Sequence, residues 1–303
     1  MDMLLSIFAE NILPVFVAAG LGYLLDRKFN LDVKTISRTS FYVLAPCLIF
    51  TSLTKSSVSG EEFGRIILFE VLVLVVLLAV SWSMARLTRL TQQQESVFLL
   101  SILFVNAGNY GLSVNLFAFG EGALARAIIF FVGSTILINT LGIFLVSRGR
   151  ADVKTALLNV FKVPMIYAVT LAFVARSLPW QIADMSWFRG LETVGRAAVP
   201  IMLLLLGIQL GRNSLGRDLK RVSVATFLRL VLAPFLSLIF ASVVGLGGDT
   251  RRACVLEASM PTAVNAIVLS LEFDVLPSFV TGVVFLSTIL SPITLTLLIA
   301  FLR

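Results

Sequence analysis

The chain has 303 residues, of which 58% are hydrophobic and only 14% are charged. This composition excludes a soluble globular domain and indicates a protein embedded in a lipid bilayer. The net charge of +7 does not predict a nucleic-acid partner, because the lysines and arginines lie between apolar segments and form no basic face with interleaved aromatic residues.

Apolar segments that are long enough to cross a hydrocarbon core of about 30 Å recur along the whole chain. We predict roughly ten membrane-spanning helices with short connections, which leave no segment for a soluble domain. In chain order, the predicted spans are residues 4–25, 36–53, 63–85, 96–119, 123–146, 157–178, 194–210, 222–246, 252–273 and 277–302. We therefore expect an all-α integral protein of the cell (plasma or inner) membrane.

The first segment, MDMLLSIFAEN, carries an acid, no basic residue and no small-residue cleavage site, so we interpret it as part of the first span and not as a signal peptide. Lysine and arginine are distributed unequally over alternate connections. The richer set holds Arg27, Lys28, Lys34, Arg86, Arg89, Arg148, Arg150, Lys154, Arg212, Arg217, Lys220 and Arg221. By the positive-inside rule, we predict that these connections, including the link at 147–154, are cytoplasmic and that both termini lie outside.

Several landmarks indicate an internal repeat with an offset of about 150 residues. The tetrapeptide STIL occurs at 134–137 and again at 287–290. Prolines recur at nearly the same offset, in the pairs Pro14 with Pro164 and Pro46 with Pro200. These landmarks divide the chain into residues 1–150 and 151–303, with an equal and odd number of predicted spans in each half. An odd number makes the second half enter the membrane from the opposite side, which gives the inverted repeats typical of secondary transporters.

Two predicted spans contain helix-breaking residues near their middle. Span 96–119 contains NAGNYG, and span 252–273 contains SMPTAVN. Proline lacks a backbone donor and clashes with the preceding turn, whereas glycine permits a sharp unwinding. Thr262 and Asn265 offer side-chain partners for the freed backbone groups. Both breaks lie roughly 15 Å along their helices, near the middle of the bilayer.

Two broken helices that meet at the midplane create a site for an anion. Where each helix restarts, near Gly111 and Thr262, unpaired N–H groups and the positive end of the helix dipole face the centre of the protein. Pro261 suits the first turn of the restarted helix, because its missing donor would be unpaired there anyway. The candidate substrate-binding residues in the two breaks are Asn106, Gly108, Asn109, Tyr110, Gly111, Met260, Pro261, Thr262 and Asn265. The asparagines can cap helix ends or bind a carboxylate directly, and the alternative for each amide or glycine is helix packing.

Other polar residues inside predicted spans need separate interpretation. GIQLG at 207–211 is a packing motif of small residues, within which Gln209 is a weaker candidate for a substrate contact. Glu257, about one turn before the second break, could bind a coupling cation, take up a proton or stabilise packing. Glu70 is a further candidate for a coupling ion or proton. Arg229 could extend along its helix to the cytoplasmic surface.

Enzymatic chemistry finds little support in the sequence. The chain contains no histidine, which removes the commonest general base and metal ligand. No glycine-rich phosphate loop, catalytic carboxylate pair or nucleophile elbow occurs in a suitable context. Cys47 and Cys254 lie inside predicted spans, and we interpret them as packing residues and not as a disulfide. The sequence therefore predicts no catalytic residue, no metal site and no cofactor.

Four motifs resemble the auxin efflux carrier family, a branch of the wider group that includes the bile acid:sodium symporters. They are PCLIFTSL from Pro46, AAVPIMLLLLGIQL from Ala197, EASMPTAVNAIVLSLEF from Glu257 and FLSTILSPITLTLL from Phe285. The resemblance covers the whole chain. It implies two inverted repeats of five spans, a scaffold made of the first, second, sixth and seventh spans, and a transport core made of the others. The fourth and ninth spans would cross at the substrate site.

The resemblance also implies elevator-like movement of the core against the scaffold, a homodimer, and transport of a small organic anion. Asn109 with its neighbours and Pro261 would belong to the substrate site, and Pro46 would face that site from the scaffold. The central loop is much shorter than the long loop of many plant carriers, so malonate or another metabolite is as suitable a substrate as auxin.

We therefore predict a secondary carrier that moves a small carboxylate across the lipid bilayer. A sodium- or proton-coupled symporter is the main alternative. A channel and a membrane-embedded ligand sensor are alternatives from other classes, although the sequence offers no attached signalling domain.

Overall fold

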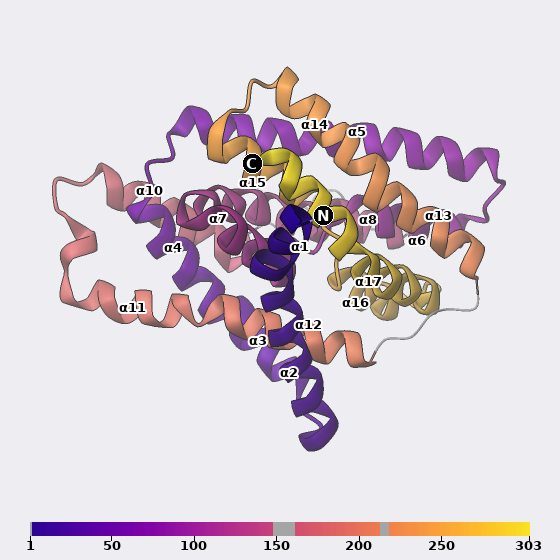
Figure 1. The fold of residues 1–303 in the computed structure, drawn as a ribbon, viewed down its shortest axis with the longest axis horizontal. Coiled ribbons are helices and arrows are strands. Elements are labelled where there is room, and N and C mark those ends of the chain that lie inside the picture. Colours follow the sequence, from indigo (N-terminus) through magenta and orange to yellow (C-terminus); the bar gives the residue numbers. More distant parts are fainter. Residues whose placement is uncertain (1, 148–160, 213–217) are drawn as a thin grey trace.

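The computed structural model describes residues 2–147, 161–212 and 218–303, and the regular elements in these ranges are helices (Figure 1). Most of the predicted link at 147–154, the start of predicted span 157–178, and Arg148, Arg150, Lys154 and Arg217 lie outside them. Seven helices of the described part are long and apolar enough to cross a membrane: Met3–Phe29, Val33–Lys55, Gly60–Leu87, Ala107–Val146, Ser186–Arg212, Leu219–Val243 and Pro277–Leu302. The prediction of an all-α membrane protein is confirmed.

These long helices are built from consecutive elements. In chain order they are α1 (Asp2–Ile7), η1 (Phe8–Ile12), α2 (Leu13–Phe29), α3 (Val33–Thr39), η2 (Ser40–Leu44), α4 (Ala45–Lys55), α5 (Gly60–Leu87), η3 (Ala107–Gly111), α7 (Leu112–Leu137), η4 (Ile138–Gly142), α8 (Ile143–Val146), α11 (Ser186–Arg196), α12 (Ala198–Arg212), α13 (Leu219–Phe227), η6 (Leu228–Leu232), α14 (Ala233–Val243) and α17 (Pro277–Leu302). Shorter separate helices are α6 (Gln92–Leu103), α10 (Pro164–Ser177), η5 (Ile182–Asp184), α15 (Gly248–Ala258) and α16 (Asn265–Glu272).

The predicted number of spans differs from the number of long helices because some predicted spans are interrupted. Span 252–273 is divided into α15 and α16, and span 96–119 is divided between α6 and the beginning of the helix that contains α7. The predicted connection between spans 96–119 and 123–146 is reduced to a kink within α7, where Gly120 has a φ of 78°. Glycine adopts this left-handed conformation without the steric penalty of a side chain, so it can turn the chain within one residue.

Proline explains three of the π-helical turns. The elements η1, η2 and η6 each end two residues before a proline, namely Pro14, Pro46 and Pro234. A proline removes one backbone donor, and its ring collides with the carbonyl of the preceding turn. Widening that turn relieves the collision while the span continues, and such π-turns are frequent at functional sites.

Helices α2 and α12 pack with their backbones in close contact. Val15, Ala19 and Gly22 form the buried face of α2. A Cβ atom at Gly22 would overlap the backbone of Leu204, and one at Gly207 would overlap the backbone of Ala19. The two backbones therefore touch where side chains would keep them apart. This contact confirms the packing interpretation of GIQLG at 207–211.

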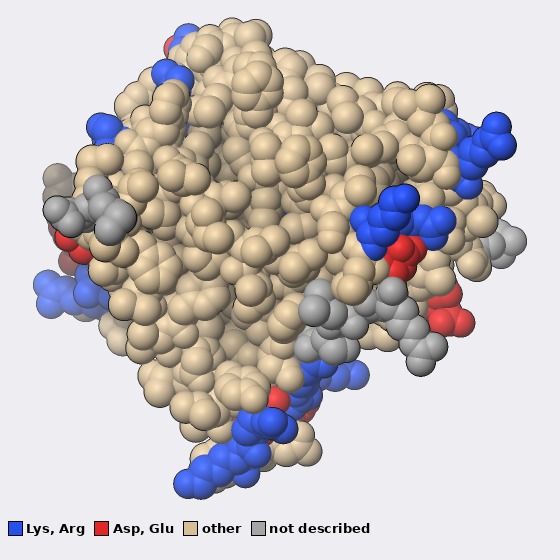
Figure 2. All heavy atoms as spheres, turned by 45° about the vertical axis from the view of Figure 1, so that its right-hand side comes forward, with Lys and Arg blue, Asp and Glu red and all other residues tan. Residues whose placement is uncertain are grey.

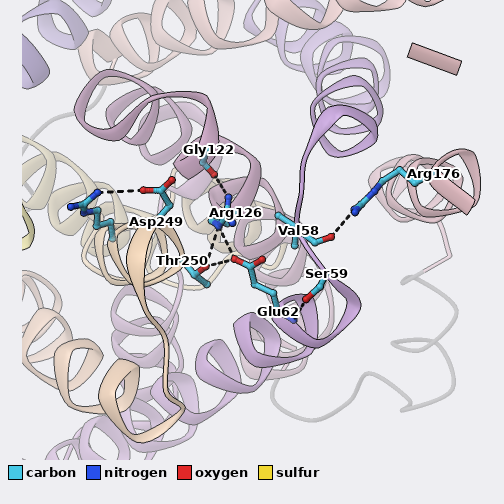
Figure 3. Close-up of polar contacts among 9 residues, drawn as sticks. Val58, Ser59, Glu62, Gly122, Arg126, Arg176, Asp249 and Thr250 are labelled. Atoms are coloured by element: carbon cyan, nitrogen blue, oxygen red, sulfur yellow. Dashed lines mark hydrogen bonds and ion pairs between the residues drawn. The ribbon is translucent and has the colours of Figure 1, made fainter. Parts of the chain in front are cut away.

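Exposed charged side chains lie at the margins of the face drawn in Figure 2. Figure 2 shows a broad face of uncharged residues with lysine and arginine confined to its edges. At one edge, Arg126 of α7 donates from Nε to Glu62 of α5 at 2.7 Å and to Thr250 of α15 at 3.0 Å (Figure 3). This network joins the first turns of α5 and α15 to the middle of α7. The two ends of the chain also lie close together, since Arg303 Nη2 is 3.9 Å from Glu10 Oε2.

Candidate functional site

The two predicted helix interruptions are present, and they contact each other. Helix α6 ends at Leu103, α15 ends at Ala258, and Val105 and Thr262 form an antiparallel bridge. The backbone N–H of Asn106 donates to the carbonyl of Pro261 at 2.8 Å, and that of Ala263 donates to the carbonyl of Phe104 at 2.9 Å. Each interrupted segment thus supplies hydrogen bonds that the other lost by leaving the helix.

Thr262 and Ser287 support the crossing from the side. The Thr262 hydroxyl donates to the carbonyl of Ser101 at 2.7 Å, and its backbone N–H donates to the Ser287 hydroxyl at 3.2 Å. Both residues are fully buried. Buried backbone groups require partners, so these hydroxyls stabilise the extended conformation that the second break adopts.

The structure shows where the two interrupted helices restart. After the first break, the π-turn η3 begins at Ala107 and the α-helix α7 begins at Leu112, next to the expected start near Gly111. After the second break, α16 begins at Asn265, so the expected start near Thr262 lies three residues too early. Pro261 does not lie in the first turn of a helix but in the extended linker, because pairing of its carbonyl with Asn106 holds that linker across the first break.

Next to the crossing lies a cavity of about 130 Å³. It brings together five of the predicted site residues: Asn106, Gly108, Asn109, Gln209 and Asn265. The other lining residues are Ser37, Ser40, Phe41, Val105, Ala107, Phe131, Ser134, Thr135, Ile138, Met165, Met202, Leu205, Ala263 and Val264. The lining is therefore polar but uncharged, with apolar walls from α7 and α12. We call this space the crossover cavity.

Two polar groups of the crossover cavity lack a protein partner. Asn106 is 5% exposed, and its Nδ2 makes no hydrogen bond; the same holds for the buried hydroxyl of Ser40. By contrast, Asn109 Nδ2 donates to Gln209 Oε1 at 3.2 Å, which joins α12 to the first break. A buried donor without a partner costs free energy unless a ligand or water satisfies it, so the amide of Asn106 is a candidate donor for such a partner.

The remaining predicted substrate residues lie outside this cavity. Tyr110, Gly111, Met260, Pro261 and Thr262 are buried in the protein core around the crossing. The Tyr110 hydroxyl accepts a hydrogen bond from Ser291 at 3.1 Å. These residues support the site but do not line it.

Pro46 does not face the crossover cavity. It lines a separate apolar hollow with Phe50, Pro164, Tyr167 and Trp187, between α4, α10 and α11. The preceding residues Ser40 and Phe41 reach the crossover cavity instead. They belong to the π-turn η2, which precedes Pro46 in the same span.

Glu257 is fully buried behind Gly111. Asn115 Nδ2 donates to Glu257 Oε1 at 2.9 Å, whereas Glu257 Oε2 and Asn115 Oδ1 have no hydrogen-bond partner. A Cβ atom at Gly111 would overlap this carboxylate, so a larger residue there would displace it. The arrangement places unpaired oxygen atoms of two side chains next to the first break.

The expectation that Arg229 extends to the cytoplasmic surface is wrong. Its side chain is only 1% exposed and donates to the carbonyls of Ile102 and Ala258, each within the last turn before a break. The last carbonyls of a helix have no partner within it and carry the negative end of its dipole. They therefore stabilise the buried guanidinium of Arg229. Glu70, 5% exposed, lines a small cavity together with Arg229.

Sequence reasoning missed several cavity residues, although one signal was available. The two STIL tetrapeptides served only as repeat landmarks, yet Ser134 and Thr135 of the first line the crossover cavity and Ser287 of the second binds the backbone of the second break. The serine and threonine hydroxyls at corresponding places in both halves could therefore have indicated residues of the site. Ser37, Ser40 and Phe41 carried no comparable pattern.

The observed structure is that of a polytopic membrane protein in which two interrupted helices cross beside an uncharged polar cavity. The chain belongs to the membrane transport protein family, which it matches over residues 7–299. This is the auxin efflux carrier group that the sequence motifs predicted. The protein is accordingly a membrane transporter.

Similarity to individual transporters extends over nearly the whole chain. An "Uncharacterized transporter" of Methanothermobacter thermautotrophicus is 30% identical, covering 95% of this chain and 96% of that protein. The "Uncharacterized transporter YfdV" of Escherichia coli is 23% identical, covering 90% of each chain. A "Putative malonate transporter" of Rhizobium meliloti is 24% identical, covering 96% of this chain and 95% of that protein.

Proposed function

We propose that this protein is a secondary carrier that binds a small organic anion in the crossover cavity and moves it across the membrane. The observation that carries the proposal is the amide of Asn106, a buried donor that lines the cavity and has no protein partner. No carboxylate lines the cavity, so an anion would meet no like charge among the described lining residues.

The surroundings of Asn106 favour an anion with an apolar part. The helical segments that restart at Ala107 and Asn265 have their positive dipole ends at the cavity, and this end of a helix favours negative charge. Phe131, Met202 and Leu205 supply apolar walls. A small carboxylate matches both features, and the relative named as a malonate transporter makes malonate the first compound to test.

We infer the transport cycle from the arrangement of helices. In this proposal, residues 1–150 and 151–303 are inverted repeats of five spans each, and the core moves like an elevator against a scaffold of the first, second, sixth and seventh spans. The close contact of α2 with α12, which joins the first and seventh predicted spans, supports such a scaffold. The proximity of Arg303 to Glu10 agrees with an even number of spans and both termini on one side of the membrane, which we propose to be the outside. A homodimer in the cell membrane completes the proposal.

The direct test is charge movement in proteoliposomes on a solid-supported membrane, with a panel of weak organic acids that includes malonate and an auxin. We expect a saturable current with at least one acid. Asn106→Ala should reduce its apparent affinity by about tenfold or more, because a hydrogen bond to a charged group contributes about 1.5–3 kcal/mol. Asn106→Ala and the control variant described below should both elute as folded protein in size-exclusion chromatography.

Asn139→Ala is the matched control. Asn139 is also inside the membrane helix, but its Nδ2 donates to the carbonyl of Thr135 at 2.8 Å and it does not line the cavity. We expect its transport to equal that of the wild type. Equal currents in Asn106→Ala and wild type would refute the cavity assignment, and unitary currents without counterflow would indicate a channel.

A second candidate, cation- or proton-coupled symport, is favoured by the carboxylate of Glu257. Its free Oε2 and the free Oδ1 of Asn115 are the kind of oxygen ligands that a hard cation prefers. Glu257→Gln keeps the shape and removes the charge. If the carrier is coupled, we expect this variant to lose the dependence of transport on sodium or on a proton gradient while the protein remains folded. If the wild-type current depends neither on sodium nor on a proton gradient, symport is refuted and the protein is a uniporter.

A further inference from the structure

Arg229 lies behind the crossing, at the point where the two helices that precede the breaks both end. It belongs to η6, a π-helical turn in the span that leads from α13 to α14. Its Nη1 donates to the carbonyl of Ile102 at 2.7 Å, and its Nη2 donates to the carbonyl of Ala258. One guanidinium group therefore connects α6 with α15.

This connection satisfies groups that the breaks leave unpaired. The last carbonyls of a helix have no partner within it and carry the negative end of its dipole. A guanidinium presents its donors in a rigid planar fork, so it can hold two carbonyls at a fixed separation. Because Arg229 does not line the crossover cavity, it acts on a bound ligand only through the two breaks.

A buried cation also needs compensation by negative charge. Glu70 of α5 lines the same small cavity as Arg229, and both have a buried polar atom without a partner, Oε2 of Glu70 and Nε of Arg229. Among the described residues, no carboxylate forms a direct ion pair with Arg229. The cavity that both residues line measures about 20 Å³, which is enough for one water molecule.

We propose that Arg229 is a positioning residue that clamps the C-terminal ends of α6 and α15, and that Glu70 neutralises it through one buried water. The clamp sets how far the two breaks can slide past each other. It thereby holds Asn106 and Asn265, which follow the breaks, at one cavity. The clamp itself follows from the geometry alone, and only its effect on anion binding rests on the proposed function.

The stability test is a double-mutant cycle with Arg229→Met, Glu70→Gln and the double variant, measured by thermal unfolding in detergent. Each single variant leaves the opposite charge buried without compensation, so both should unfold at a lower temperature than the wild type. We expect the double variant to lose clearly less than the sum of the two single losses. Strictly additive losses would overturn the pairing with Glu70.

The positioning role is tested by amide hydrogen exchange, which needs no substrate. In Arg229→Met the amides of Asn106 and Ala263 should exchange at least about tenfold faster, because their cross-strand bonds open more often. Amides of α2 and α12 should keep their wild-type rates. Unchanged exchange at Asn106 and Ala263 would overturn the clamp.

Arg229→Lys separates charge from geometry. Lysine retains the positive charge that Glu70 compensates, but its single ammonium lacks the planar fork that reaches two carbonyls. We therefore expect stability near that of the wild type together with fast exchange at the two breaks. If the amides of Asn106 and Ala263 exchange as slowly in this variant as in the wild type, a positive charge alone is sufficient to hold the two breaks, and the clamp is refuted. As a control, Arg221→Met removes a half-exposed ion pair with Asp218 and should change neither measurement.

For anion binding, malonate is the probe. If the wild type binds malonate, Arg229→Lys should bind it more weakly in proportion to the loss of protection. If the wild type binds none of the acids tested, the proposed function fails, whereas the exchange and unfolding results still decide on the clamp.

Discussion

Gly22→Val is expected to prevent formation of the folded protein or to destabilise it by about 3 kcal/mol or more, the upper end of overpacking costs. The added Cβ would overlap the carbonyl and Cα of Leu204, which are backbone atoms of α12. A side chain could rotate away from such an overlap, but a helix backbone has to move as a whole. Because the backbones of α2 and α12 are in close contact, we expect the variant to aggregate or to unfold at a lower temperature, as measured by size-exclusion chromatography and thermal unfolding in detergent.

Gly20→Val is the matched control, since Gly20 lies in the same helix and a Cβ there meets no atom within 4 Å. It carries the same change in helix propensity and in hydrophobicity. We expect its unfolding temperature to stay close to that of the wild type. If Gly22→Val and Gly20→Val unfold at the same temperature, the backbones of α2 and α12 do not touch, and the scaffold proposed from their contact loses its support.

The positions of the two helix breaks could be predicted from the sequence because their causes are local. Pro261 and the glycines at 108 and 111 disfavour a regular helix wherever they occur inside a span. The point where the second helix restarts could not be predicted in the same way. It depends on the hydrogen bonds of Asn106 with Pro261 and of Ala263 with Phe104, which join residues far apart in the chain.

Charged and proline residues show the same limit. A sequence places Arg229 inside a span, but only the folded chain brings the carbonyls of Ile102 and Ala258 to it and makes burial favourable. Pro46 was expected at the site by family resemblance, yet its span presents Ser40 and Phe41 to the cavity. Which residues of a span face a cavity depends on the rotation of the helix, and π-turns change that rotation.

The charge of the crossover cavity leads to the second large effect, the expected loss of anion transport in Asn109→Asp. Asn109 is half-buried at the cavity and bonded to Gln209, so an aspartate there would keep its position while adding a negative charge. Two like charges about 4 Å apart at an effective dielectric constant of about 20 repel by about 4 kcal/mol, which is about a thousandfold in affinity. The measurement is the concentration dependence of the transport current for the acid that the wild type carries.

Asn109→Leu separates repulsion from the loss of a hydrogen bond, because it removes the amide without adding charge. We expect a reduction of about tenfold for leucine, far smaller than for aspartate. Asn30→Asp, outside the membrane-spanning helices, makes the same chemical change away from the cavity and should leave transport unchanged. If aspartate and leucine at position 109 reduce affinity equally, the substrate carries no negative charge near this residue. The anion would then have to bind elsewhere, and the crossing of the two broken helices would serve the movement of the core and not recognition of its cargo.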